Sequence, residues 1–405
     1  MGEQTSSKVP QIRFKEFEGD WAETNLGELF PITSAARVHK NEWRQSGVPF
    51  FRSSDVVSSF KGTENQKAFI SHELYEELSA KVGRVRTGDI LVTGGGSIGI
   101  PYLVKSDDPL YFKDADLLWF KIRESVDSNF LYSTLCSRSF HQYLNSISHI
   151  GTIAHYTVEQ AKGTPVTLPN ELCEQTKIGE YFGELDRLIG LHQRKHDKLL
   201  ILKKAMLQKM FPQPGASTPE IRFKGFSRAW VKNEFKQIAL RSTQSTSEEH
   251  LPRIEYEDII SGTGRLNKDV FKKSSRKVGI KFERNDVIFG KLRPYLKNWW
   301  LAEFGGVAVG DFWVFKSAAA TSNFIYCLIQ TEAFERIANQ SAGSKMPRSD
   351  WKLVSNSVFR IPTHIEEQQK IGTYFCTLDE LISKHATQLN KLQQIKSACL
   401  EKMFV

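Results

Sequence analysis

The sequence has 405 residues, of which 40% are hydrophobic and 25% are charged. This length allows about two to three domains with separate cores, and this composition excludes a wholly disordered chain. Lys and Arg outnumber Asp and Glu by 55 to 46, and the resulting net charge of +9 is compatible with a polyanionic partner without indicating one.

The chain carries no sequence signal for export, membrane insertion or metal binding. Its first segment, MGEQTSSKVPQIRFKEF, lacks the apolar core of a signal peptide, and no run of about 18 apolar residues occurs. The five cysteines are scattered, without a C-x-x-C pair or a histidine at metal spacing. We therefore expect a cytoplasmic protein with no membrane role, no disulfide framework and no bound metal.

Short β-like runs and short helical runs alternate between residues 9 and 168, as in GDILVTG and SNFLYSTLCSRSFHQYL. This mixture predicts an α+β domain. GGGSIG at 94–99 fits the pattern G-x-G-x-x-G, but Pro101 follows where a dinucleotide-binding helix would have to open. We interpret the segment as a turn, or as a flexible loop that approaches a ligand.

A long helix is predicted next, over residues 170–211. From Ile178 to Met210, mostly apolar residues recur at alternating steps of four and three, which is the heptad spacing of packed helices. Asn170 and Glu174 form a suitable helix start just after a proline. At about 40 residues, this helix would be about 60 Å long.

The second half of the chain repeats this order. A linker is predicted at 212–218, a second α+β domain extends to 362, and a second long helix occupies 363–405. EQTKIGEYFGELDRLIGLH at 174–192 returns as EQQKIGTYFCTLDELISKH at 367–385, with 12 of 19 positions identical. IRFKEFEGDW returns as IRFKGFSRAW, SNFLY as SNFIY and QKMF as EKMF, whereas residues 31–85 have no convincing counterpart in 240–282. The chain is therefore a two-fold duplication with divergent contents.

Each long helix could lie on the surface of its own domain, or the two helices could pack on each other. Their length, the sustained heptad and the existence of two copies favour an antiparallel coiled coil with pseudo-two-fold symmetry. The residues expected at this helix packing surface are Ile178, Phe182, Leu185, Ile189, Ile371, Phe375, Leu378 and Ile382.

Signatures of catalysis are missing from the sequence. Gly290-Lys291 is followed by leucine and not by the serine or threonine of a P-loop. No Pro-Asp dipeptide accompanies the short acidic-x-Lys triplets, as a common nuclease site would require, and no Pro-Pro occurs for an amino-methyltransferase loop. Neither ATP hydrolysis, DNA cleavage nor methyl transfer is supported.

Basic loops are the remaining signal. FGKLRPYLK at 289–297 and GSKMPRS at 343–349 combine cations with glycine and proline, and the matching places in the first half are 93–102 and 151–156. Such loops can reach phosphates with lysine and base edges with arginine, although a charge run is usually only a solvated surface. The candidate DNA-contacting residues are Lys40, Arg44, Arg52, Lys61, Ser97, His155, Tyr156, Arg265, Lys291, Arg293, Lys297, Lys345 and Arg348.

Taken together, the repeated E-Q-x-K-I-G-x-Y-F-x-x-L-D motif and the IRFK segments resemble the specificity subunit of type I restriction-modification systems. The resemblance covers essentially the whole chain. It implies two target-recognition domains, at 1–169 and 212–362, each followed by a helical coiled-coil region, at 170–211 and 363–405. It also implies a bipartite, asymmetric DNA target.

The resemblance further implies that the chain is not an enzyme and binds no cofactor itself. Its partners would be double-stranded DNA, two methyltransferase subunits that use S-adenosylmethionine, and motor-nuclease subunits that use ATP and Mg. Equal helices would give two equal partners equal docking surfaces, while divergent domains would read different half-sites. Two rival functions are a coiled-coil scaffold, which would not need basic loops in both halves, and a DNA enzyme, which should carry a catalytic constellation.

Overall fold

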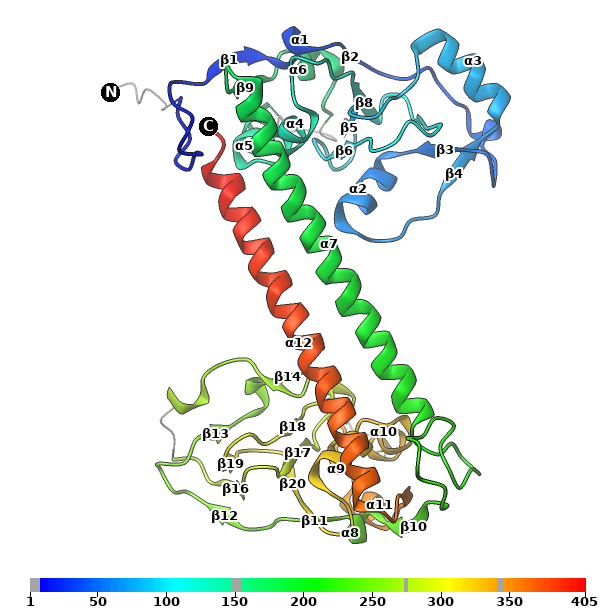
Figure 1. The fold of residues 1–405 in the computed structure, drawn as a ribbon, viewed down its shortest axis with the longest axis vertical. Coiled ribbons are helices and arrows are strands. Elements are labelled where there is room, and N and C mark those ends of the chain that lie inside the picture. The colour runs from blue at the N-terminus through cyan, green and yellow to red at the C-terminus, as the bar shows by residue number, and fades with distance from the viewer. Residues whose placement is uncertain (1–7, 148–154, 273–275, 341–345) are drawn as a thin grey trace. The chain divides into compact units, whose positions relative to one another are not determined.

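The computed structural model describes residues 8–147, 155–272, 276–340 and 346–405 (Figure 1). The chain divides into two compact units. Unit 1 comprises residues 1–191 and 388–405, and unit 2 comprises residues 192–387. Each unit therefore contains one globular region together with a portion of each long helix.

Unit 1 is built on a four-stranded antiparallel sheet. The strand order is β2 (Ile32–Thr33), β8 (Leu117–Phe120), β5 (Ile90–Thr93) and β6 (Pro101–Leu103). Every residue of β5 and β8 is buried, because ILVT and LLWF are nearly continuous apolar runs. These two strands form the centre of the sheet, and the chain that leaves β5 is therefore anchored firmly.

Two smaller sheets complete unit 1. β4 (Ala68–Ile70) and β7 (Tyr111–Phe112) flank β3 (Val48–Phe51), and β1 (Ala22–Asn25) pairs with β9 (Pro165–Leu168). The helices and 3-10 turns are α1 (Leu26–Leu29), η1 (Lys40–Glu42), α2 (Ser53–Lys61), α3 (His72–Val82), α4 (Ser128–Leu135), α5 (Arg138–Ile147), α6 (Val158–Lys162) and the beginning of α7 (Leu172–Lys209).

Unit 2 contains two four-stranded sheets. One has the order β11 (Ala239–Arg241), β20 (Phe312–Ser317), β17 (Val287–Gly290) and β18 (Trp299–Leu301). The other has the order β12 (Ser245–Thr246), β16 (Gly279–Phe282), β19 (Gly306–Ala308) and β13 (Arg253–Ile254). Two further pairs of strands are β10 (Val231–Glu234) with β21 (Val358–Ile361), and β14 (Ile259–Ile260) with β15 (Arg265–Leu266). The helices and turns are α8 (Phe235–Ile238), η2 (Tyr256–Asp258), η3 (Val270–Lys272), η4 (Pro294–Leu296), α9 (Ser322–Leu328), α10 (Glu332–Ala338), α11 (Trp351–Asn356) and most of α12 (Ile365–Lys402).

The two units share one plan, which confirms the α+β prediction for both halves. In each, a buried central strand, β5 or β17, lies between the strand that follows it and a later strand, β8 or β20. The SNFLY and SNFIY segments form the equivalent helices α4 and α9. The regions that lack a counterpart in sequence also differ in structure, since residues 31–85 contain the helices α2 and α3 beside three short strands, while the described part of 240–282 consists of strands and 3-10 turns.

The two predicted long helices are present, and each has 38 residues. In unit 1, Tyr181 and Asp186 of α7 contact Cys399 and Lys396 of α12, with atom separations of 3.5 and 2.5 Å. Residue numbers thus rise along one helix while they fall along the other. The helices are antiparallel in this unit, as expected for two long heptad-patterned helices present in two copies in one chain.

The same arrangement occurs in unit 2 with the helices exchanged. Lys203 of α7 forms an ion pair of 2.6 Å with Asp379 of α12, and His192 lies 2.9 Å from His385 between their Nδ1 atoms. Asp379 is the repeat counterpart of Asp186. One aspartate of the repeated motif therefore binds a lysine of the other helix in each unit.

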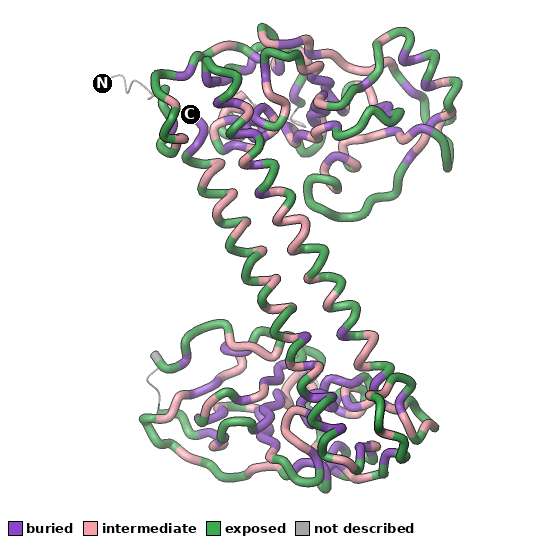
Figure 2. Tube along the Cα trace, viewed as in Figure 1, coloured by how far each residue is buried: buried purple, intermediate pink, exposed green. Residues whose placement is uncertain are grey.

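The residues predicted for helix packing are buried at the ends of the helices and half-buried toward the middle (Figure 2). Ile178, Phe182 and Leu185 belong to a core that also contains Trp21 of the same domain and Phe404 from the end of α12. In unit 2, the corresponding core joins Ile371, Phe375 and Leu378 to domain residues and to the end of α7, whereas Ile189 and Ile382 are only half-buried. Each helix thus packs on its own domain and on the other helix together.

The repeated glutamate holds the IRFK segment in each unit. Arg13 binds Glu174 through Nε and Nη2 at 2.7 and 2.8 Å, and Arg222 binds Glu367 in the same way at 2.6 and 2.8 Å. The two glutamates are 2% and 0% exposed. A planar guanidinium fits a carboxylate in this two-bonded geometry, which explains why both residue types recur.

The glutamine and glycine of the repeated motif hold each long helix against the helix formed by SNFLY or SNFIY, which is α4 in unit 1 and α9 in unit 2. The Gln175 side chain accepts a hydrogen bond from the Asp127 amide, and Gln368 accepts one from the Thr321 amide. A Cβ atom on Gly372 would lie 2.5 Å from Asn323 Cβ, so only glycine allows this approach. The repeat therefore sets the orientation of each domain on its helix.

Candidate nucleic-acid interface

Two loops of unit 2 that were singled out in the sequence lie side by side. The loop after β17 and the loop before α11 form an antiparallel bridge between Leu292 and Arg348. The Arg293 amide donates to the Pro347 carbonyl at 2.7 Å, and the Ser349 amide donates to the Lys291 carbonyl at 2.8 Å. We call residues 291–297 and 346–349 the paired loops of unit 2.

Unit 1 has the same arrangement. The loop after β5 is bridged to the segment before α6 by Gly95 and His155, and the Tyr156 amide donates to the Gly94 carbonyl at 2.8 Å. Residues 94–100 and 155–156 are the paired loops of unit 1. Residues 151–154, which the sequence also indicated, lie outside the described residues, as do 343–345 of the second half, including Lys345.

An aspartate just before β8 or β20 supports each pair of loops. In unit 1 the Gly94 amide donates to the Asp116 carbonyl at 2.8 Å, and in unit 2 the Lys291 amide donates to the Asp311 carbonyl at 2.9 Å. These bonds continue the pairing of the two central strands beyond the sheet. The sheet therefore positions the loops at the same place in both units.

The glycine-rich segment of unit 1 is a turn, and it is not a dinucleotide-binding motif. Strand β6 begins at Pro101, where a nucleotide-binding helix would have to start. Gly96 and Gly99 have φ angles of +74° and +77°, which glycine adopts without strain. A Cβ atom on Gly94 would lie 2.7 Å from the Tyr156 carbonyl oxygen, so the close pairing of the loops requires this glycine.

The loop after β17 is held in an unusual backbone conformation. Arg293 and Lys297 flank the η4 turn with φ angles of +47° and +57°, values that are uncommon for residues other than glycine. The Tyr256 hydroxyl accepts a hydrogen bond from the Leu292 amide at 2.8 Å and donates one to the Asp311 carbonyl at 2.7 Å. Tyr295, which stands between Arg293 and Lys297 in the sequence, is 54% exposed. The loop thus presents a fixed surface of basic, aromatic and apolar groups.

Charge in this region is organised around the Asp311 carboxylate. Arg348 donates to Asp311 Oδ2 from Nε at 3.2 Å and from Nη2 at 3.0 Å, while Lys291 Nζ lies 3.5 Å from Oδ1. The hydrogen bond from Arg348 lowers the pKa of Asp311 below its usual value. Lys297 lies farther along the loop and binds Glu335 at 2.7 Å.

The other candidates of unit 1 are dispersed or engaged. Lys40, Arg44 and Lys61 are exposed near η1 and at the end of α2, away in sequence from the paired loops. The Arg52 guanidinium donates to Asp55 at 2.8 Å, and the same carboxylate accepts a hydrogen bond from the Arg52 amide at the start of α2, so this arginine is engaged within unit 1. Ser97 and His155 are both exposed on the paired loops.

Two candidates are withdrawn from the interface. Tyr156 is 1% exposed, and its hydroxyl lies 2.6 Å from Thr164 Oγ1, so its side chain belongs to the core and only its backbone joins the loops. Arg265 lies on β15 and donates to the Asp379 carbonyl at 3.5 Å beside a cavity of about 210 Å³. Arg265 therefore faces helix α12. Its positive charge alone does not show whether it is exposed to DNA.

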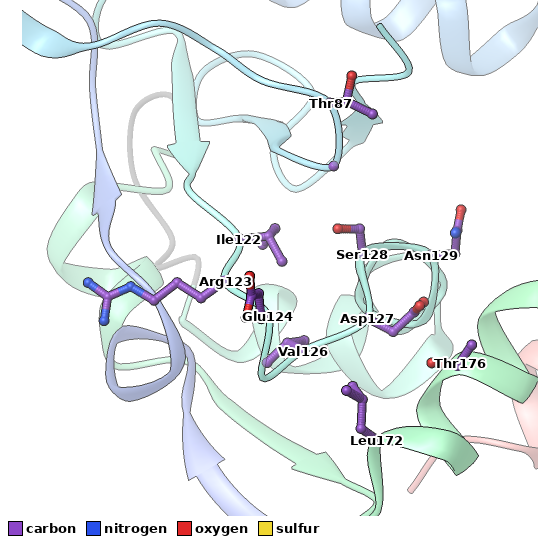
Figure 3. Close-up of a pocket in the computed structure, with 11 residues that line it drawn as sticks. Thr87, Ile122, Arg123, Glu124, Val126, Asp127, Ser128, Asn129, Leu172 and Thr176 are labelled. Atoms are coloured by element: carbon purple, nitrogen blue, oxygen red, sulfur yellow. The ribbon is translucent and has the colours of Figure 1, made fainter. Parts of the chain in front are cut away.

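A further pocket, of about 430 Å³, lies in unit 1 near the start of α4 (Figure 3). Thr87, Arg123, Asp127 and Ser128 are among the residues that line it, and none of its lining residues belongs to the paired loops. Asp127 already accepts a hydrogen bond from the Phe130 amide as the N-cap of α4. Among the described residues, no group of three His, Cys, Asp or Glu side chains could hold a metal, and no helix is long and apolar enough to cross a membrane.

Sequence reasoning missed Asp116, Asp311 and Tyr256. An acidic residue is not an obvious component of a surface for a polyanion, and a tyrosine 35 residues before Lys291 gives no sign of supporting that loop. A usable signal is position, because each aspartate stands just before the apolar run that forms β8 or β20.

Comparison with known proteins adds independent information. Residues 18–200 match the model of the family described as type I restriction modification DNA specificity domain. A Haemophilus influenzae protein named as a type I restriction enzyme specificity subunit is 28% identical over 166 residues, or 40% of each chain. The match therefore spans about two fifths of that relative's length.

One solved structure resembles the fold over nearly the whole chain. The S subunit of a type I restriction-modification system from M. genitalium has a TM-score of 0.63 at 16% identity, covering 98% of this chain and 99% of that one. The HsdS subunit from Thermoanaerobacter tengcongensis has a TM-score of 0.40 at 16% identity, covering 95% and 96%.

Proposed function

We propose that the chain is a DNA-reading subunit of the type I restriction-modification kind, whose paired loops contact a bipartite target; the match of residues 18–200 to the model of the type I restriction modification DNA specificity domain supports this. Each unit would read one half-site. The observation that carries this proposal is the occurrence of the same loop platform in both units with different side chains upon it. A duplicated frame with unlike contact residues suits an asymmetric pair of half-sites.

The chemistry of the loops supports different modes of reading. Unit 2 offers Lys291, Arg293 and Arg348, which can bind phosphates and guanine edges. Unit 1 offers Ser97, His155 and exposed glycine backbone, which form shorter and mostly uncharged contacts. The two half-sites would therefore differ in sequence and in the salt dependence of their recognition.

Modification and cleavage would belong to other chains. We propose that two methyltransferase subunits, which use S-adenosylmethionine, and motor-nuclease subunits, which use ATP and Mg, assemble with this chain. Its own role would be to hold them at the target. Residues of the long helices that stay exposed, such as Glu184 and Arg187, are available for such contacts.

The test is to map methylated bases in cells that contain the chain and its methyltransferase partner. Arg348→Ala should relax one position of the second half-site and leave the first half-site unchanged, with a discrimination loss of about 1 to 3 kcal/mol at that position. Lys236→Ala is a matched control, because Lys236 is exposed in unit 2 but outside the paired loops. Modification that is unaffected by Arg348→Ala, or altered in both half-sites, would contradict the assignment.

Binding measured with purified complex provides a second test. With about six to ten phosphate contacts, affinity for duplex DNA should fall about a thousandfold or more between 50 and 200 mM salt. A coiled-coil scaffold would show neither sequence preference nor this salt dependence. The chain without a partner should give no methylation, which separates the proposal from a DNA enzyme.

A further inference from the structure

Asp311 is an anion placed among the cations of a surface that we assign to DNA. It lies just before β20, and its carboxylate joins Lys291 of one paired loop to Arg348 of the other. Two cations and one anion leave this cluster with a net positive charge. Its attraction for phosphate is therefore reduced but not reversed, and the acidic residue calls for a more specific role than charge balance.

The geometry of Arg348 indicates what that role is. Nε and Nη2 both donate to Asp311 Oδ2, which engages one side of the guanidinium. A guanidinium has five N–H donors in a rigid plane, so its outer edge still carries two parallel donors on Nη1 and Nη2. Half of the Arg348 side chain is exposed, as an outer edge open to a ligand requires.

The backbone fixes the other end of the same side chain. Arg348 is bridged to Leu292, and Ser349 donates to the Lys291 carbonyl, so its Cα is tied to a loop that is itself held by Tyr256. A free arginine loses up to about 2 kcal/mol of side-chain entropy when it is ordered. Here the carboxylate and the bridge order it before any ligand arrives.

We propose that Asp311 is a positioning residue that aligns Arg348 to read the O6 and N7 atoms of one guanine in the second half-site. The proposal rests on the proposed function, since it names the base that this surface reads. Two parallel donors match the two major-groove acceptors of guanine, which no other base presents. A rotating arginine would bind phosphates equally well but would discriminate less.

The alternative role for Asp311 is to mask two cations. Removal of a mask would raise affinity for every DNA sequence alike, because Lys291 and Arg348 would both become available to phosphates. Removal of a positioning group would instead reduce discrimination at a single base pair. The two roles therefore predict different results for the same variant.

The test uses the full chain assembled with its methyltransferase partner and a duplex that carries the mapped target, with each base pair of the second half-site substituted in turn. Asp311→Asn keeps the shape of the side chain and removes its charge. It should reduce discrimination at one G·C pair by about tenfold and leave the other positions unchanged. Arg348→Ala should affect the same pair, and the double variant should be no worse than Arg348→Ala alone.

Glu335→Gln is the matched control, since Glu335 binds Lys297 of the same loop but does not touch Arg348. It should leave discrimination unchanged. If Asp311→Asn does not fold, Arg348→Lys serves instead, because lysine keeps the charge but lacks the fork; it should relax the same pair while keeping the salt dependence.

The outcomes separate this proposal from the one on which it rests. Suppose that the unaltered complex discriminates at the G·C pair, that Arg348→Ala loses this discrimination and that Asp311→Asn keeps it. That result would overturn the positioning role of Asp311 but not the proposed function. A uniform rise in affinity for Asp311→Asn would also overturn the positioning role, in favour of a mask. Absence of any sequence preference in the unaltered complex would defeat the proposed function itself.

Discussion

Gly179→Ala tests whether the glycine of the repeated motif exists to let α7 approach α4. A Cβ atom at this position would overlap Asp127 Oδ1 and would lie 2.7 Å from the Phe130 amide nitrogen. Those two atoms form the N-cap hydrogen bond of α4, at 2.8 Å. The added methyl group must therefore push the helices apart or break the cap.

The expected magnitude combines three effects. Overpacking of a tight contact costs about 1 to 3 kcal/mol, and loss of an N-cap costs about 1 kcal/mol. Replacement of a helical glycine by alanine stabilises the helix by about 0.5 to 1 kcal/mol, which offsets part of this cost. Gly179→Ala should thus lower the free energy of unfolding of unit 1 by about 1 to 3 kcal/mol.

Gly183 provides the matched control on the same helix. It is exposed, and a Cβ atom there would meet no atom within 4 Å, so Gly183→Ala should raise stability by about 0.5 to 1 kcal/mol. Hydrogen exchange of the amides in α4 reports the local effect, and denaturant unfolding reports the global one. Equal stability of the two alanine variants would refute the close-approach argument.

Three further results are expected. Arg222→Leu should destabilise unit 2 by about 3 to 5 kcal/mol in denaturant titrations, because it leaves the buried Glu367 carboxylate without an opposite charge. Arg222→Leu combined with Glu367→Leu should recover part of the loss, and equal losses would place the pair outside the core. Burial and the neighbouring His192 lower the pKa of His385 from 6.5. The contribution of neutral His385 to stability is therefore complete above pH 6.5 and is lost as the pH falls through the lower pKa of the folded state. His385→Asn should reduce this loss of stability in acid in thermal melts, and parallel pH profiles of the two proteins would contradict the expectation. Residues 1–211 should dimerise in light scattering, because their QKMF end can replace the EKMF end that covers unit 1 in the full chain, and a monomer would contradict this.

Periodicity and self-similarity predicted the parts of the fold that depend on local sequence. The two long helices begin and end within three residues of the predicted ranges, since a heptad pattern extends along one segment and needs no distant partner. The loop positions of the two halves also correspond as expected, because each follows an apolar strand. The antiparallel direction followed from duplication of the helix.

The strand order, and the burial and pairing of individual side chains, could not be predicted, because they depend on residues far apart in the chain. Arg265 and Arg348 are similar in sequence terms, yet one faces α12 and the other is held beside Asp311 at the paired loops. Tyr156 follows an exposed histidine but reaches Thr164 inside the core. Burial of a tyrosine or pairing of an arginine is decided by tertiary neighbours that no local pattern reports.

The structure also changes the explanation of the repeat. Equal docking surfaces for two partners would require identical residues on the outside of α7 and α12, but the identical positions mostly face inward, where they bind the domain or the other helix. Apart from the exposed lysines Lys177 and Lys370, most exposed positions of the same stretch differ, as in Glu180 against Thr373 and Arg187 against Glu380. Internal packing is therefore sufficient to explain why the motif occurs twice. Partners that bind both halves alike must use features other than these outward side chains, or must accept different residues at the two sites.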